Sequence, residues 1–238
     1  MALPKINDKP KYELTIPSTG KSVRYRPYLV REEKILMMAM ESQDKKAALN
    51  AIVDTITACV DEDLNKKDLT IFDIEYMFIK IRSKSIGETT TIGLKCKSCD
   101  SVNEVQVNLD DVKIKSNKEV NKEILVDGDI NITLKMKWPQ FYDVVLIEED
   151  KKLSETERTF KLIAKCMESL STDDEIFLLK DETEEEVMRF IDSLNNDQFN
   201  KIKEFVQNMP RAEKEIEYTC TSCAHENKIM LRGIDDFF

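Results

Sequence analysis

Four cysteines, arranged as two short pairs, are the residues whose types and spacing point most directly to chemistry. The pairs Cys96–Cys99 and Cys220–Cys223 lie about 120 residues apart, yet both stand in the pattern Cys-x-Ser-Cys-x-x-x-Asn followed by alternating apolar residues. A Cys-x-x-Cys turn presents two thiolates to one metal ion, and a second such turn completes a tetrahedral four-cysteine site. The matching flanks predict that the pairs are the two halves of one split zinc ribbon, which binds one structural zinc ion per chain.

Two disulfides, or a redox-active pair, are the alternatives that the cysteine spacing leaves open. A redox Cys-x-x-Cys usually begins a helix, whose N-terminus lowers the thiol pKa, whereas both pairs here precede strand-like sequence. Ordinary ribbons separate their pairs by about 15–20 residues, so a whole subdomain would be inserted between the halves of this one. A closed shell of four thiolates has no open position for a substrate, and the zinc is therefore expected to hold the fold.

The rest of the chain offers little for catalysis, and no enzyme is predicted. The only histidine, His225, could replace a thiolate as ligand, although two complete cysteine pairs make this unnecessary. A Ser/His or Cys/His nucleophile would also have to use His225. The run Gly20-Lys21-Ser22 resembles the end of a phosphate-binding loop, but Thr15 stands where the first glycine should be. A hairpin turn is the expected structure there.

Composition and charge narrow the class of protein further. The 238 residues are 41% hydrophobic and 34% charged with a net charge of −10, which is typical of a soluble globular protein. The acidic balance argues against a general nucleic-acid binder. No apolar run approaches the ~20 residues that cross a bilayer, and the first residues do not resemble a signal peptide. We therefore expect a reducing cytoplasm, with Cys59 and Cys166 as buried core thiols.

Apolar periodicity predicts a mixed α+β fold. Residues on both sides of Ser18–Lys21 alternate as a β-hairpin, and a second hairpin is expected around Asp127-Gly128. Helical spacing is present at about 30–40, 48–59, 70–84, 141–147, 155–170, 183–194 and 196–209. The predicted division is an N-terminal arm and β-hairpin (1–28), a helical region (29–86), the split zinc ribbon (87–110 plus 213–233), an inserted hairpin and helical subdomain (111–212) and a C-terminal tail (234–238).

Two apolar groups could either fill the core or bind a partner. Met37, Met38 and Met40 could form an adaptable binding surface, but core filling is the preferred interpretation. Phe237-Phe238, after two aspartates, is either a docking peptide or a segment folded back on the core. The arm and hairpin at 1–28 and this tail are the expected partner surfaces.

Several stretches of the first 110 residues resemble a known family. The most distinctive are Arg26-Pro27, Glu32-Glu33-Lys34 and Phe72-Asp73-Ile74-Glu75 with Arg82 and Gly87-Glu88, followed by the pair that begins at Cys96. They are similar to the small baseplate hub protein of T-even-type contractile-tailed bacteriophages. Trp138-Pro139 and the second cysteine pair are compatible with the same family.

The resemblance implies a structural or assembly component of the tail baseplate hub. Such a protein would contact other hub and tail proteins, in the virion and in the host cytoplasm during assembly, with no small-molecule substrate and no catalytic residues. The predicted zinc site follows from the spacing of the cysteines in this chain and not from the resemblance. The alternative function is a zinc-ribbon nucleic-acid-binding or transcription-associated protein, for which basic residues should cluster around the ribbon. Five lie near it, diluted by acidic neighbours: Lys95, Lys97, Lys214, Lys228 and Arg232.

Overall fold

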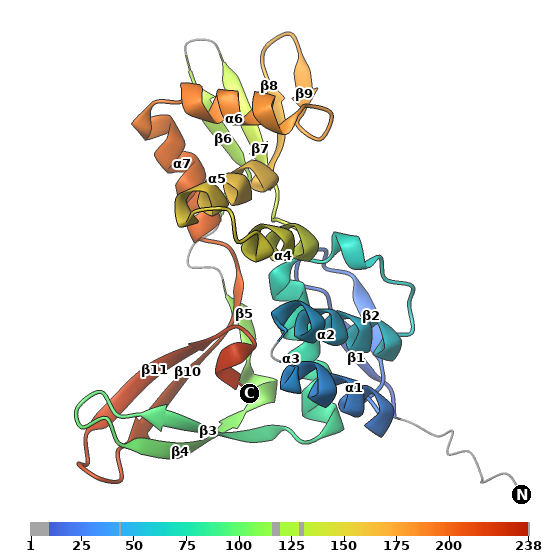
Figure 1. Ribbon diagram of the computed structural model, residues 1–238, viewed down its shortest axis with the longest axis vertical. Helices are drawn as coiled ribbons and strands as arrows, with labels where there is room; N and C mark the ends of the chain where they lie inside the picture. Colours follow the sequence, from blue (N-terminus) through green and yellow to red (C-terminus); the bar gives the residue numbers. More distant parts are fainter. Residues whose placement is uncertain (1–9, 43, 116–119, 129–130, 238) are drawn as a thin grey trace, which may run out of the picture. The chain divides into compact units, whose positions relative to one another are not determined.

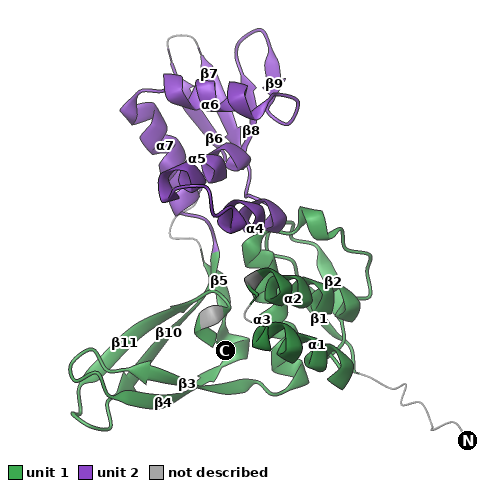
Figure 2. Cartoon of the chain, viewed as in Figure 1, with its two compact units in different colours: residues 1–115, 211–238 green, residues 116–210 purple. Residues whose placement is uncertain are grey.

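A computed structural model describes residues 10–42, 44–115, 120–128 and 131–237. The chain forms two compact units, unit 1 (1–115 and 211–238) and unit 2 (116–210), so the outer segments of the sequence fold together (Figure 2). Helices and strands are mixed in both units, which confirms the predicted α+β class. Most of the expected N-terminal arm and the final Phe238 lie outside the described residues.

Unit 1 begins with the predicted hairpin and three helices (Figure 1). Strands β1 (Tyr12–Thr15) and β2 (Ser22–Tyr25) pair antiparallel, and Gly20 adopts the positive φ of 70° that their turn requires. The helices are α1 (Val30–Glu41), α2 (Lys45–Cys59) and α3 (Ile71–Ser85), with a short 3₁₀ turn, η1 (Lys66–Asp68), before α3. Helix α3 is the most deeply buried of the three because its apolar residues face inward on several sides.

A buried carboxylate joins α3 to the hairpin. Asp73 completes a capping box with Thr70, accepting hydrogen bonds from its backbone N–H at 2.9 Å and its hydroxyl at 2.7 Å. The other oxygen of Asp73 accepts the backbone N–H of Ser18, in the turn between β1 and β2, at 2.8 Å. One side chain thus accepts hydrogen bonds both from the N-terminus of α3 and from the turn of the hairpin.

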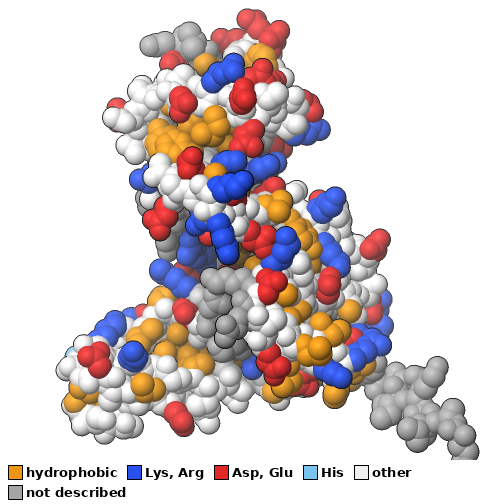
Figure 3. Space-filling model, viewed as in Figure 1, with side chains coloured by type: hydrophobic (Ala, Val, Ile, Leu, Met, Phe, Trp, Pro, Cys, Tyr) orange, Lys and Arg blue, Asp and Glu red, His pale blue; other side chains and the backbone are white. Residues whose placement is uncertain are grey.

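Helix α1 differs from the sequence-based expectation. Only Glu32 and Leu36 are buried, whereas Met37, Met38 and Met40 are about half exposed, as Met38 shows with 60% of its surface accessible. The prediction that these methionines fill the core is therefore wrong. Val30 and Ile35 of the same helix are exposed too, and hydrophobic side chains are visible on the surface of unit 1 (Figure 3).

Two long antiparallel hairpins complete unit 1. Strands β3 (Thr89–Lys95) and β4 (Val102–Asn108) form the first, and β10 (Arg211–Thr219) and β11 (Glu226–Arg232) form the second. The short 3₁₀ turn η2 (Leu109–Asp111) leads to β5 (Lys113–Lys115), which pairs with β10. Strand β5 was not predicted, since three residues are too few to show alternation.

The apolar sides of the two hairpins share one core with α3. Its buried residues include Ile79 of α3, Val107 of β4 and Ile216 of β10. Phe237, in the 3₁₀ turn η3 (Asp235–Phe237), is fully buried in the same cluster. Of the two interpretations of the tail, the folded-back one therefore holds for Phe237.

Unit 2 is a four-stranded antiparallel sheet with helices. The strands follow the order β6 (Glu123–Asp127), β7 (Ile132–Met136), β8 (Met167–Ser171) and β9 (Ile176–Leu178). The helices are α4 (Phe141–Glu149), α5 (Glu155–Cys166), α6 (Glu184–Ser193) and α7 (Asn196–Gln207). The helix predicted at 155–170 ends at Cys166, and its last residues are strand β8. Strand β9 was not predicted.

The core of unit 2 lies between its sheet and helices. Leu134 and Met136 of β7, Ile163 of α5 and Ile202 of α7 are fully or almost fully buried in it. Cys166 is buried there as predicted, and burial raises the pKa of its thiol to about 12. It is therefore a packing residue and not a reactive thiol.

Candidate metal centre

The four cysteines of the two pairs come together where the tips of the two hairpins of unit 1 meet (Figure 1). Their sulfur atoms all lie within 4.8 Å of one another, and the Cys96–Cys223 and Cys99–Cys220 sulfurs are each 3.7 Å apart. Four sulfurs at Zn–S bonds of 2.3 Å in a tetrahedron would be separated by about 3.8 Å. The cluster therefore has the donor set and the spacing of a four-thiolate metal site. The spacing is too long for disulfides, whose sulfurs lie about 2.05 Å apart.

Each pair sits in a tight turn between two strands, and the two turns are built alike. In the first, Cys96 N–H donates to Ser101 O at 2.9 Å and Asp100 N–H donates to Cys96 O at 3.0 Å. In the second, Cys220 N–H donates to His225 O at 2.8 Å and Ala224 N–H donates to Cys220 O at 2.9 Å. These bonds close a tight turn of the backbone that begins at the first cysteine of each pair.

The residue after each second cysteine adopts a left-handed conformation. Asp100 has φ of 58° and Ala224 has φ of 57°, a region that favours glycine. Asp tolerates this region better than Ala because its short polar side chain can hydrogen-bond locally. The conformation is present in both turns, so it belongs to the geometry that points the sulfurs toward one another.

Backbone N–H groups also point at the sulfurs. Ser98 N–H lies 3.4 Å from Cys96 Sγ, and Ser222 N–H lies 3.4 Å from Cys220 Sγ. Both are donors to the buried sulfur of their pair, while the sulfurs of Cys99 and Cys223 belong to exposed residues. Donors of this kind favour the thiolate, which is the form that binds metal.

Two asparagines link the turns reciprocally. Asn103, on β4, accepts the backbone N–H of Thr221 at 2.8 Å and directs its amide nitrogen to Cys220 Sγ at 3.6 Å. Asn227, on β11, accepts the backbone N–H of Lys97 at 3.0 Å and directs its amide nitrogen to Cys96 Sγ at 3.5 Å. Each asparagine is almost fully buried. Each hairpin thus supplies a polar clamp for the cysteine turn of the other.

Hydrogen bonding changes the acidity of the two buried cysteines. Ser101 Oγ lies 3.1 Å from Cys220 Sγ, and this contact, helped by backbone N–H groups, lowers the pKa of the Cys220 thiol to about 5. Burial opposes ionisation of Cys96, but hydrogen bonds from Ser98 and Asn227 still lower its pKa. These shifts favour the thiolates of Cys220 and Cys96. At Cys223 a backbone hydrogen bond from His225 lowers the thiol pKa, but contacts with the other three sulfurs and burial outweigh it and raise the pKa to about 12.

The remaining candidate residues lie outside the cluster. His225 is exposed and contributes its backbone carbonyl to the second turn, and the four-residue cluster does not include it. Cys59 is a buried residue of α2. The sequence had not assigned a role to Ser101, Asn103 or Asn227, although the shared asparagine in both cysteine motifs was the available signal.

Acidic neighbours pair with the basic residues around the ribbon. Lys228 lies 2.7 Å from Glu215 and 2.9 Å from Glu217, and Arg232 lies 3.2 Å from Glu213. Lys214 pairs with Asp111 at 2.8 Å. These basic side chains are therefore partly neutralised, and they do not form the unpaired patch that nucleic-acid binding requires.

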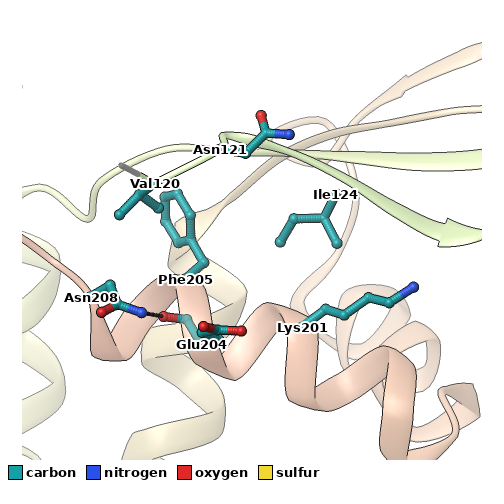
Figure 4. A pocket seen from close by; sticks show the side chains of 7 residues that line it. All are labelled: Val120, Asn121, Ile124, Lys201, Glu204, Phe205 and Asn208. Atoms are coloured by element: carbon teal, nitrogen blue, oxygen red, sulfur yellow. Dashed lines mark hydrogen bonds between the residues drawn. The ribbon is translucent and has the colours of Figure 1, made fainter. Parts of the chain in front are cut away.

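Unit 2 contains a shallow cavity of about 240 Å³ between the start of β6 and α7 (Figure 4). Val120, Ile124 and Phe205 form its apolar wall. Lys201 at its rim donates to Leu125 O at 2.9 Å, and Asn208 donates to the carbonyl of Glu204 at 2.8 Å. The cavity lining combines no nucleophile with a base, so the cysteine cluster remains the stronger candidate site.

The fold and the cysteine cluster define an α+β protein in which the first and last segments of the chain fold together, and each segment contributes one cysteine pair to the cluster. Residues 9–238 match the family described as T4 bacteriophage base plate protein, and the chain belongs to that family. The predicted resemblance to T4-type baseplate proteins is thereby confirmed. Comparisons with curated proteins and with solved structures gave no match.

Family membership makes this a phage baseplate protein of the virion tail, where it contacts other tail proteins. Among the described residues, no helix has both the length and the apolar character needed to span a bilayer.

Proposed function

We propose that this protein is a structural or assembly component of the baseplate hub of a contractile-tailed phage, acting through protein–protein contacts and without catalysis. The observation that carries the proposal is the family match over residues 9–238. The hub is favoured within the baseplate because the motifs around Arg26-Pro27 and Phe72–Glu75 are similar to the small hub protein. In the structure these motifs have structural roles, such as the bond from Ser18 to Asp73.

We propose further that Cys96, Cys99, Cys220 and Cys223 bind one zinc ion per chain. The 3.7 Å sulfur separations and the lowered pKa values of Cys96 and Cys220 support this ligand set. Zinc is the metal that suits four thiolates in a closed tetrahedral shell. When bound, it would supply a structural cross-link and no reactive position.

The cross-link would join segments that are far apart in sequence. We assign the split ribbon to 87–110 and 213–233, and the inserted subdomain to 111–212. The first cysteine turn precedes the insertion and the second follows it, so zinc would hold both ends of the insertion in one place. Because the free energies of metal binding and folding are linked, the metal would stabilise the folded state of unit 1.

Other contacts of unit 1 also hold these distant segments together, without metal. Glu75 of α3 accepts the backbone N–H of Ala212 at 3.2 Å, where the chain returns from the insertion. Tyr218 of β10 donates to Lys95 O of β3 at 3.0 Å. The first bond holds the returning chain against α3, and the second joins the two hairpins beside the cysteine turns.

Gradient sedimentation of an infected-cell lysate and of purified particles tests the proposed function, with the chain detected by antibody. A structural hub subunit will co-migrate with baseplate-sized complexes and with particles. An assembly factor will be present in light intermediates and absent from particles. Absence from all baseplate intermediates and from particles would contradict the hub proposal.

A further inference from the structure

Strand β9 forms an open edge of the sheet in unit 2. It pairs with β8 through Ser169↔Leu178, Leu170↔Phe177 and Ser171↔Ile176, and it is the last strand in the sheet order. Edge strands of this kind can pair with a strand from another chain unless charge, proline or a covering element prevents it. The three residues of β9 contain neither a charge nor a proline.

The pairing pattern shows which backbone groups point outward. Thr172 N–H donates to Glu175 O at 2.9 Å and Leu179 N–H donates to Glu168 O at 3.1 Å, so these are hydrogen-bonded pairs of the β8–β9 ladder. Hydrogen-bonded and non-hydrogen-bonded pairs alternate in antiparallel strands, which directs the backbone groups of Phe177 toward β8. The N–H and C=O of Ile176 and the N–H of Leu178 then face away from the sheet, while Leu178 O accepts the N–H of Asp181 at 2.9 Å.

The side chains of β9 are apolar and exposed. Ile176 is 71% exposed, Phe177 39% and Leu178 43%, so neither face of the strand is fully covered within the described part of unit 2. A short strand with outward backbone groups and exposed apolar side chains has the features that strand addition uses: main-chain bonds for affinity and alternate side chains for contact.

The charges that flank β9 indicate what kind of strand it would accept. Five carboxylates and one lysine stand on its two sides: Asp173, Asp174, Glu175, Lys180, Asp181 and Glu182. All six side chains are exposed, and acidic side chains gather at the top of unit 2 in Figure 3. Two copies of this segment would repel each other, which disfavours pairing of β9 with a second copy. A strand with basic flanks would be attracted.

We propose that β9 binds an extended apolar segment of a partner protein that carries lysine or arginine at both ends, adding it as a fifth strand to the sheet of β6–β9. The proposal deepens the proposed function, since it gives the baseplate protein a docking edge. The test measures strand pairing at β9, however, so a negative result would leave the hub assignment unchanged.

The test uses the full-length chain and a synthetic peptide. The peptide has a central segment of five residues in which valine and threonine alternate, and two lysines flank this segment on each side. Hydrogen exchange with mass spectrometry should show slower exchange in peptides that cover 172–182 when the probe is added. Ile176→Lys should weaken binding at least tenfold, because it adds a positive charge to the edge. Leu146→Lys, at an exposed apolar position of α4, is the matched control and should leave binding unchanged.

A second probe with glutamates in place of the lysines tests the charge argument. It should bind at least tenfold more weakly than the lysine probe at low salt. Absence of protection at 172–182 with millimolar lysine probe would overturn the proposal, as would equal binding of both probes. Concentration-dependent dimerisation that Ile176→Lys abolishes would also overturn it, because the occupant would then be a second copy.

Discussion

The amide nitrogen of Asn227 lies 3.5 Å from the sulfur of Cys96, on the opposite hairpin. Asn103 makes the reciprocal contact to Cys220 at 3.6 Å. The two cysteine turns are therefore linked by polar contacts in addition to any metal. Groups that hydrogen-bond to metal ligands orient them and tune their affinity, so the asparagines are positioning residues for the proposed zinc site.

Replacing both asparagines should weaken zinc binding while leaving all four cysteines in place. We expect Asn103→Ala with Asn227→Ala to lower zinc affinity about 10–100-fold, which is the usual effect of removing such partners. Competition with a chromophoric chelator measures this. Gln106→Ala, at an exposed position of β4, is the control and should not change the affinity. Equal affinities of the double variant and the wild type would show that the asparagines serve packing alone.

The buried carboxylate of Glu32 should make stability depend on pH. Burial disfavours its charged form, but hydrogen bonds from Arg31, Arg26 and the Leu29 N–H dominate and lower its pKa from 4.5 to about 2. A lowered pKa stabilises the folded state above the unfolded value of 4.5, and this stabilisation is lost as pH falls from there toward 2. The full effect at pH 7 is about 2–3 kcal/mol.

Denaturant unfolding of Glu32→Gln at two pH values measures this contribution. The variant should be less stable than the wild type by about 2–3 kcal/mol at pH 7, with a difference about 1–2 kcal/mol smaller at pH 3. Glu41→Gln removes a carboxylate from an exposed position on the same helix and should change stability by less than about 0.5 kcal/mol. A pH-independent difference for Glu32→Gln would contradict the assigned ion pairs.

Asp73 should be more important than an ordinary helix cap. It is fully buried and accepts three hydrogen bonds, two from Thr70 and one from Ser18. Asp73→Ala leaves these donors unpaired, and we expect a loss of about 3 kcal/mol or more in unfolding free energy. Asp44→Ala, at the exposed N-cap of α2, is the comparison and should cost about 1 kcal/mol. Similar costs for the two variants would show that the bond to Ser18 contributes little.

Phe237 should stabilise the fold although it stands near the end of the chain. Its side chain is fully buried in the core shared by α3 and the two hairpins. Phe237→Ala should therefore destabilise the protein by about 3–5 kcal/mol in thermal or denaturant unfolding. Phe177→Ala, on the exposed edge strand β9, should cost less than about 1 kcal/mol. A negligible cost for Phe237→Ala would restore the interpretation of the tail as a docking peptide.

The sequence was informative where a pattern repeats or has a clear period. The two cysteine motifs share four positions, and this shared pattern identified segments that the structure brings together. The turn at Ser18–Lys21 and the capping residues Thr70 and Asp73 likewise carry local signals, since hairpin turns and capping boxes depend on few neighbouring residues.

The sequence was uninformative where tertiary contacts decide the structure. Met167 continues the helical apolar pattern of α5, but pairing with β7 makes it the first residue of β8. Strands β5 and β9 have three residues each, which is too short for alternation to be detected. The exposure of Met38 depends on which face of α1 meets its neighbours, and periodicity alone does not determine this. The role of Asn103 requires the opposite hairpin to be in place.

Native mass spectrometry of the purified, reduced full-length chain tests the four-cysteine zinc site most directly. We predict one zinc ion per chain, lost in both Cys99→Ser and Cys223→Ser, with a lower melting temperature in each variant and in chelator-treated wild type. Cys166→Ser, in the core of unit 2, should cost stability yet retain the zinc. A wild-type chain without metal, or retention of zinc by both ligand variants, would contradict the account.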